Sequence, residues 1–302
     1  MLGSYLDRLR ETAPLVHCIT NYVTANDVAN MLLACGASPI LSDEPSDAAE
    51  VTACTRGLCL NLGTMKSWSV DSMLAAGEEA ARLGHPILLD PVGVGASSLR
   101  RTAAGLLLDR LPVACIRGNL SEIAVLAGLD VESRGVDTGC GGQSAETVCT
   151  LARELAKARG CVVALTGQTD VVTDGDRTYL IGNGCPEMGR VTGAGCQLSA
   201  LAAAFLAASP GASLEAAAAA VCAMGLAGEI ALARQAPGDG NATLRCRIID
   251  AVYHMDGHTL NKGARYESDR YRIDNVFIIL CLCPPLTLDE YAFIPEAPHR
   301  RR

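Results

Sequence analysis

A run of five small residues, Thr192-Gly-Ala-Gly-Cys196, stands directly before the strong helix formers of Gln197–Ala208. Glycines at a helix entrance leave backbone N–H groups free, and these donors bind anions together with the positive end of the helix dipole. Gly193, Ala194 and Gly195 are therefore candidates for holding a phosphate, and Cys196 would face it as a nucleophile or base. The same letters also fit a flexible turn with a small buried cysteine, and the loop alone does not decide between the two.

Polar side chains follow several short apolar runs elsewhere in the chain. Asp90, Arg117 and Thr166 each come directly after such a run, and Asn61 and Thr64 close another. If the runs are parallel strands, their carboxyl ends lie along one edge of a sheet, which is where open α/β sheets bind ligands. An acid, a guanidinium and hydroxyl groups at that edge indicate a site for a nucleotide and a metal ion.

Two carboxylates match the demands of Mg²⁺, which prefers one or two carboxylates together with phosphate oxygens and waters. They are Asp90 and Glu122. Each also has a structural interpretation. Asp90 precedes Pro91, a common pairing in turns. Asn119 and Glu122 have the spacing of a helix capping box, which does not exclude a metal role for Glu122.

The elements that must position these residues alternate between short continuous apolar runs and longer helical segments. This rhythm predicts an α/β fold with a central, mostly parallel sheet flanked by helices on both faces. The expected strands cover residues 37–41, 57–63, 86–89, 114–116 and 161–165, followed by an antiparallel pair at 170–174 and 177–182. The expected helices are 26–35, 69–83, 144–159, 197–208 and 214–235.

Composition excludes some classes of function. The 302 residues are 49% hydrophobic and carry a formal net charge of −8. That length suits one large α/β domain or two smaller ones. Because basic residues form no stripe, we expect no nucleic acid partner. The chain has neither a Walker A pattern nor a complete Rossmann fingerprint, since Gly93-Val-Gly95 lacks the third glycine.

The fourteen cysteines do not form a disulfide pattern. There is no Cys-x-x-Cys, and most cysteines lie within apolar runs, where a free thiol behaves as a small hydrophobe. The first residues lack the apolar core of a secretory signal, and the alanine-rich segment around residues 216–220 is interpreted as a packed helix and not as a membrane span. We therefore expect a protein of the reducing cytoplasm without a membrane partner.

Seven motifs, taken in order over about residues 10–260, resemble the hydroxyethylthiazole kinase family. They are Leu15–Asn21, Leu32–Pro39, Asn61–Thr64, Leu89–Ala96, Ile116–Asn119 with Glu122–Ile123, Thr166–Gly167 and Val191–Cys196. The resemblance implies a ribokinase-like fold and phosphorylation of 4-methyl-5-(2-hydroxyethyl)thiazole in thiamine salvage, with ATP and Mg²⁺. It also implies a homotrimer with sites between subunits. The kinase domain would cover residues 1–260, and residues 261–302 would form a C-terminal extension of unknown role.

The resemblance also implies roles for single residues. The thiazole contacts would be Asn21, Leu41 and Gly193, completed by Asn61, Gly63 and Thr64 from a neighbouring subunit. The ATP contacts would be Arg117, Thr166, Gly193, Ala194 and Gly195, with Asp90 and Glu122 associated with Mg²⁺ and Cys196 near the attacking hydroxyl.

Three residues keep two alternatives open. Leu41 stands where the family usually has methionine, and Glu187 brings a charge to a position that is usually apolar. Both indicate a changed acceptor, which would make the protein a kinase for another small alcohol of the same superfamily. Cys196 is a weak base, since an unperturbed thiol has a pKa of about 8.5. It therefore leaves open a nucleotide-binding protein with little catalysis.

Overall fold

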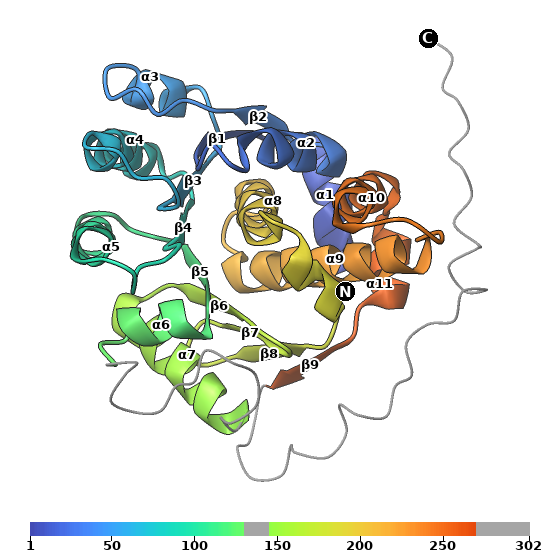
Figure 1. Ribbon diagram of the computed structural model, residues 1–302. Helices are drawn as coiled ribbons and strands as arrows, with labels where there is room; N and C mark the ends of the chain where they lie inside the picture. The colour runs from blue at the N-terminus through green and yellow to red at the C-terminus, as the bar shows by residue number, and fades with distance from the viewer. Residues whose placement is uncertain (130–144, 270–302) are drawn as a thin grey trace.

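The computed structural model describes residues 1–129 and 145–269 (Figure 1). Its strands are β1 (Leu15–Ile19), β2 (Ser38–Ile40), β3 (Gly57–Asn61), β4 (Ile87–Asp90), β5 (Cys115–Asn119), β6 (Val162–Thr166), β7 (Asp170–Thr173), β8 (Thr178–Ile181) and β9 (Tyr266–Asp269). Within these residues they form one sheet in the order β2-β1-β3-β4-β5-β6-β7-β8-β9. Strands β1 to β6 pair in parallel, and β7, β8 and β9 continue the sheet antiparallel. The prediction of a mostly parallel sheet is confirmed.

Helices cover both faces of the sheet (Figure 1). One face carries α3 (Ala48–Ala53), α4 (Ser69–Leu83), α5 (Ser98–Arg110), α6 (Leu120–Leu126) and α7 (Ala145–Arg159). The other carries α1 (Gly3–Thr12), α2 (Ala25–Cys35), α8 (Ala194–Ala208), α9 (Ser213–Ala233), α10 (Asn241–His254) and α11 (Gly257–Gly263). A short 3-10 helix, η1 (Pro186–Arg190), leads into α8. The two faces hold separate apolar cores because the strands are buried on both sides.

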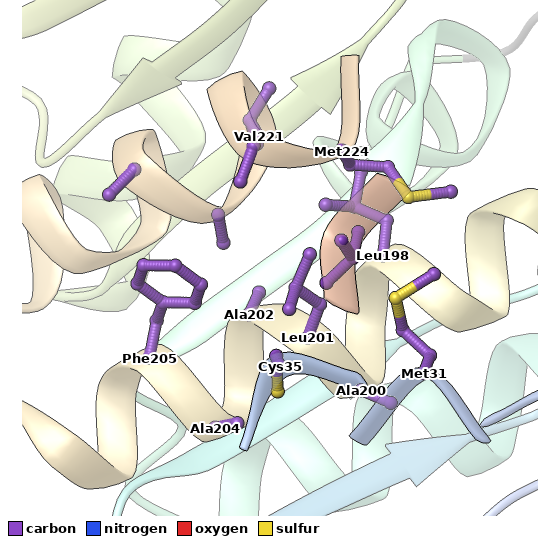
Figure 2. Packing of buried hydrophobic residues seen from close by; sticks show 14 of the residues in the cluster. Met31, Cys35, Leu198, Ala200, Leu201, Ala202, Ala204, Phe205, Val221 and Met224 are labelled. Atoms are coloured by element: carbon purple, nitrogen blue, oxygen red, sulfur yellow. The ribbon is translucent and has the colours of Figure 1, made fainter. Parts of the chain in front are cut away.

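Small side chains let α8 and α9 lie close together and close to the sheet. Most of α9 is buried, with eight buried alanines among its 21 residues, and α8 is buried from Cys196 to its end. Figure 2 shows Leu201 and Phe205 of α8 directed toward the same cluster as Val221 of α9. Because α8 contacts β1, β3 and β4, its N-terminus is held against the carboxyl edge of the sheet.

Helix α9 is long and apolar enough to cross a membrane, judged by length and composition alone. However, 83% of its most apolar window is buried inside the fold. It contacts α8, α10 and the strands β6 and β7. The structure therefore agrees with the interpretation of this alanine-rich segment as a packed core helix.

The N-terminal helix packs against the last helices of the described chain. The amide of Gly3 donates to Asn261 Oδ1 at 2.8 Å, and Gly257 donates to Asp7 Oδ1 at 3.0 Å. Beyond the expected domain boundary at residue 260, α11 continues to Gly263 and β9 pairs with β8. Residues 261–269 thus belong to the same sheet and core. The rest of the expected extension lies outside the described residues.

Candidate active site

The predicted site residues gather where the parallel strands end. Register pairs Asn61 at the end of β3 with Asp90 at the end of β4, and Asn119 of β5 with Thr166 of β6. The N-terminus of α8 meets this edge, because Cys196 Sγ accepts hydrogen bonds from strand-end side chains. The expectation that separate strand ends meet at one place is thus met by the geometry.

Asp90 is fully buried and only partly satisfied. Its Oδ2 accepts from Asn61 Nδ2 and from Ser199 Oγ, both at 2.7 Å. Its Oδ1 has no hydrogen-bond partner in the described chain, and Arg117 Nη1 lies 4.0 Å from it. Burial raises the pKa of Asp90 to about 6, although Arg117 and Ser199 pull it down. A buried carboxylate oxygen without a partner is a position that a hydrated cation can fill.

Both carboxylate oxygens of Glu122 accept hydrogen bonds from backbone amides. Oε2 accepts from the amide of Asn119, whose side chain accepts in return from the amide of Glu122, so the predicted capping box is present. Oε1 accepts from the amide of Gly93 at 2.9 Å, in the loop after β4. Each oxygen keeps a further lone pair. Glu122 therefore joins the β4 and β5 ends and can still accept from a metal-bound water.

Cys196 lies in the first turn of α8 and is 9% exposed. Its Sγ accepts from Asn21 Nδ2 at 3.1 Å and from Asn61 Nδ2 at 3.3 Å. Burial, and next the charge of Asp90, raise the pKa of the Cys196 thiol. Because this pKa lies above the ordinary thiol value, the thiol is protonated at pH 7.

The anion loop is wound into α8 and not separate from it. We predicted a helix start at Gln197, but α8 begins at Ala194, with Gly193 as N-cap in the left-handed region at φ +86°. A Cβ at Gly195 would lie 2.5 Å from Arg117 Nη1, so this glycine makes room for the guanidinium. First-turn amides have no intrahelical acceptors. The amide of Ala194 donates to the carbonyl oxygen of Val191 at 3.3 Å, and the next amides, those of Gly195 and Cys196, present donors together with Arg117.

Arg117 is held by Thr166, whose Oγ1 accepts from Nη2 at 2.8 Å. Its Nε is buried and has no partner within the described residues. A guanidinium that keeps unused donors beside a helix N-terminus is suited to phosphate oxygens. Arg117 and Thr166 thus lie side by side, and their contact with a nucleotide stays a prediction.

The expected thiazole contacts lie beside Cys196. Asn21 Nδ2 lies 3.3 Å from Asn61 Oδ1, and the amide of Tyr22 donates to Thr64 Oγ1. The loop Asn61–Thr64 thus meets Asn21 within one chain, and its reach to the site of a neighbouring subunit, which the family resemblance implied, stays a prediction. Leu41 follows β2 and is 38% exposed.

Three residues that the sequence did not single out belong to this cluster. Ser199 donates to Asp90, and Thr24 donates its hydroxyl to Asn21 Oδ1 at 3.0 Å. Asp170 Oδ1 accepts from the amide of Gly167, and burial raises the pKa of Asp170 to about 6. Ser199 could have been found from its i+3 spacing to Cys196 on the helix, which places both on one face. The other two carry no such signal.

Comparison with known proteins agrees with this geometry. A sequence model of the hydroxyethylthiazole kinase family matches residues 6–258. The chain belongs to the hydroxyethylthiazole kinase family. A hydroxyethylthiazole kinase of Clostridium acetobutylicum is 46% identical over 272 residues, which cover 89% of this chain and all of the relative.

Solved structures support the same family and its fold. The structure of the hydroxyethylthiazole kinase protein from Pyrococcus horikoshii is 35% identical, with a TM-score of 0.78 over 89% of this chain and 98% of that one. A ribokinase-like superfamily protein from Enterococcus faecalis is 14% identical, with a TM-score of 0.57 over 82% and 93%. The latter shows likeness of fold alone. The fold is ribokinase-like, as the sequence resemblance implied.

Proposed function

We propose that this kinase transfers a phosphoryl group from ATP to the hydroxyl of 4-methyl-5-(2-hydroxyethyl)thiazole in thiamine salvage. The observation that carries the proposal is the convergence of two different surfaces on Cys196. The amides of α8 and Arg117 form a cationic side, and Asn21 and Asn61 form a neutral polar side. Family membership supports the thiazole alcohol as acceptor.

In this proposal the nucleotide phosphates lie against the N-terminus of α8. Phosphoryl transfer depends on alignment and charge neutralisation more than on covalent help. Arg117, fixed by Thr166, offsets negative charge on the transferring group, and the amides of Gly193–Cys196 hold its oxygens. Because these donors are preorganised, they need little rearrangement during transfer.

Mg²⁺, when bound with ATP, would offset phosphate charge, and Asp90 with Glu122 are the residues that would hold it. The unpartnered Oδ1 of Asp90 fits this role, and Glu122 fits it through water. No cluster of three or more His, Cys, Asp or Glu side chains occurs among the described residues. That is the expected pattern for a metal that arrives largely coordinated by phosphate and water.

The acceptor lies, in this proposal, against the surface that Asn21 and the loop Asn61–Thr64 form together. Asn21 and Asn61 hold the neutral thiol of Cys196 in a fixed orientation beside the acceptor hydroxyl. A neutral thiol is a poor general base, so proton removal contributes little. Alignment supplies most of the acceleration.

Four apolar side chains in the segments next to the acceptor side are exposed. They are Tyr22, Val23, Leu41 and Trp68, and Lys66 Nζ lies over the rings of Tyr22 and Trp68. A group of exposed apolar side chains beside a site is typical of a protein interface. We propose that a neighbouring copy covers it in a homotrimer. We also propose a cytoplasmic location, which agrees with the free state of the cysteines in residues 1–129 and 145–269.

A coupled ADP-release assay, run with and without hydroxyethylthiazole, tests the function. We expect turnover that requires the thiazole alcohol. The matched variants are Asn21→Ala, expected to raise KM for the thiazole, and Asn30→Ala on exposed helix surface, expected to change nothing. Turnover only with a sugar or pyrimidine alcohol would show that the acceptor is that alcohol and not the thiazole. Tight ATP binding without any phosphoryl transfer would indicate a nucleotide-binding protein without kinase activity.

A further inference from the structure

One guanidinium joins the loops that follow two neighbouring strands. Arg100 lies in the first turn of α5, where its amide donates to the N-cap Ser97 Oγ at 3.3 Å. Its Nη1 donates to the carbonyl oxygens of Leu62 and Val92, the latter at 2.8 Å, and its Nη2 donates to that of Gly63. Leu62 and Gly63 follow β3, and Val92 follows β4.

The two loops belong to different halves of the proposed site. On the acceptor side, the amide of Gly63 donates to Asn61 Oδ1 at 2.8 Å, and the same oxygen faces Asn21. On the metal side, the amide of Gly93, next to Val92, donates to Glu122 Oε1 at 2.9 Å. Arg100 thus touches the backbone on both sides without lying between the reacting groups.

The chemistry of this contact requires arginine. Three carbonyl oxygens from two segments point toward one side chain, and a planar guanidinium offers five N–H donors in a fixed fork. A lysine ammonium is a point charge on a flexible stem and cannot hold three carbonyls at fixed mutual positions. The contact therefore fixes the positions of the two loops relative to each other, and it also provides donors to the three carbonyl oxygens.

We propose that Arg100 is a positioning residue that fixes the acceptor loop Leu62–Gly63 relative to the metal loop Val92–Gly93. The inference rests on the proposed function, because it takes these loops to hold the thiazole alcohol and the Mg²⁺-bound nucleotide. The nucleotide contacts at Arg117 and α8 do not depend on Arg100. Loss of the fork therefore weakens acceptor alignment, while Arg117 and the α8 amides retain most of the ATP affinity.

The test compares Arg100→Lys with Arg101→Lys, a change at the exposed neighbouring arginine of the same helix. For Arg100→Lys we expect kcat/KM for the thiazole to fall about 100-fold, the scale of a misplacement near 1 Å. The ATP dissociation constant, measured by calorimetry, should stay within about twofold. Arg101→Lys should resemble the parent in every measurement.

A second readout does not depend on activity. Trp68 is the only tryptophan of the chain and follows the acceptor loop, before α4. If Arg100 holds that loop, acrylamide quenching of Trp68 fluorescence increases in Arg100→Lys and not in Arg101→Lys. Millimolar guanidinium should partly reverse both the quenching and the lost turnover of an Arg100→Ala variant, by supplying the missing fork.

Two results would overturn the inference. One is an Arg100→Lys enzyme with unchanged thiazole KM, kcat and Trp68 quenching. The other is a parallel loss of ATP affinity, thiazole affinity and melting temperature without guanidinium rescue, which means a general structural role. If the parent chain shows no thiazole-dependent turnover, the proposed function fails, and the quenching comparison still decides whether Arg100 positions the loop.

Discussion

Single residues in this site are held in electrostatic states that differ from their states in water. Asp90 keeps a carboxylate at zero exposure, where desolvation opposes its charge and Arg117 favours it. Cys196, a few ångströms away across Asn61, is pushed toward its neutral form by the same burial and by Asp90. The site therefore contains an acid whose role depends on its negative charge and a thiol that stays in its neutral form.

Asp90→Asn should lower kcat at least about 100-fold while the protein stays folded. The asparagine side chain keeps an oxygen acceptor but has no negative charge to balance a cation. The substitution also removes a buried charge. At pH 8 without nucleotide we therefore expect a melting temperature equal to or above that of the parent. Steady-state kinetics and thermal melts on the same samples check this. If activity merely follows a lowered melting temperature, Asp90 is a structural residue only.

Cys196→Ala should cost less than Asp90→Asn, with a loss in kcat below about 100-fold. The raised pKa of the thiol leaves little thiolate at pH 7, so there is little base catalysis to lose. The measurement is kcat at saturating ATP from pH 6 to 9. A folded, ATP-binding alanine variant without any turnover would show that sulfur itself is required.

At the scale of elements, the entrance to α8 depends on a residue without a side chain. Gly193 has a φ of +86°, and a Cβ there would lie 2.5 Å from Thr24 Cγ2. Gly211, in the turn before α9, has a φ of +77° but nothing within 4 Å of its missing Cβ. An alanine at either position would have a strained left-handed backbone, but only an alanine at 193 would also clash with a neighbouring side chain.

Gly193→Ala should destabilise the protein by more than the roughly 1 kcal/mol that left-handed strain alone costs at Gly211→Ala. It should also weaken ATP binding, because Thr24 and the first turn of α8 must move apart. Chemical unfolding and calorimetric titration of both variants provide the comparison. Equal unfolding free energies and intact ATP binding in both would remove the role given to the α8 entrance.

The hairpin of β6 and β7 carries a half-buried acid at its turn, Asp170, whose pKa is raised to about 6 by desolvation. Because this folded pKa exceeds the ordinary value near 3.9, its stabilising contribution is complete below pH 4 and is lost as the pH rises through 6. Asp170→Asn avoids that loss and keeps an oxygen for the amide of Gly167. The free energy of unfolding of the variant relative to the parent should therefore increase by about 1–3 kcal/mol between pH 4 and 7. Melting temperatures of both proteins measured across this range show the increase. A stability difference between variant and parent that does not depend on pH would contradict the raised pKa of Asp170.

Elements with strong local patterns could be predicted from the sequence, and those defined by tertiary contacts could not. Helix α4 has the predicted bounds, and β3, β4 and β6 differ from prediction by one or two residues at their ends. The start of α8 was placed three residues late, because the glycines at 193 and 195 have low helix propensity, and their close approach to Thr24 and Arg117 is a tertiary contact that the local pattern does not show. Strand β9 pairs with β8 across more than 80 residues of chain, a contact that no local pattern indicates.

The candidate site divides in the same way. Residues that end a strand or enter a helix, such as Asp90, Arg117 and Cys196, could be found because strand ends have a known place in α/β sheets. Arg100 and Thr24 could not, because both act on main-chain atoms or on other side chains that are distant in sequence. Their role exists only once the loops have been brought together.

The whole molecule exposes its apolar side chains unevenly, and the group beside the acceptor side includes Val23 at 69% exposure. Val23→Glu should convert a trimer to monomers and reduce activity if a neighbouring copy covers this group. Leu106→Glu, at an exposed position of α5 on the other face of the sheet, is the control and should do neither. Light scattering gives the mass relative to the 31.4 kDa chain. A fully active parent monomer would end the shared-site proposal.

The pairing of α1 with the last helices also orders events during synthesis. The amide of Gly3 donates to Asn261, which is 258 residues further along the chain. Arg10 donates to the carbonyl oxygen of Val252, which is 242 residues further along. At 5–20 residues per second, the ribosome takes roughly 12–50 s to supply these partners. Throughout that time Leu6 and Leu9, fully covered in the finished protein, have no α11 to cover them. Helix α1 is therefore made well before α10 and α11, and it reaches its final packing only after they have followed.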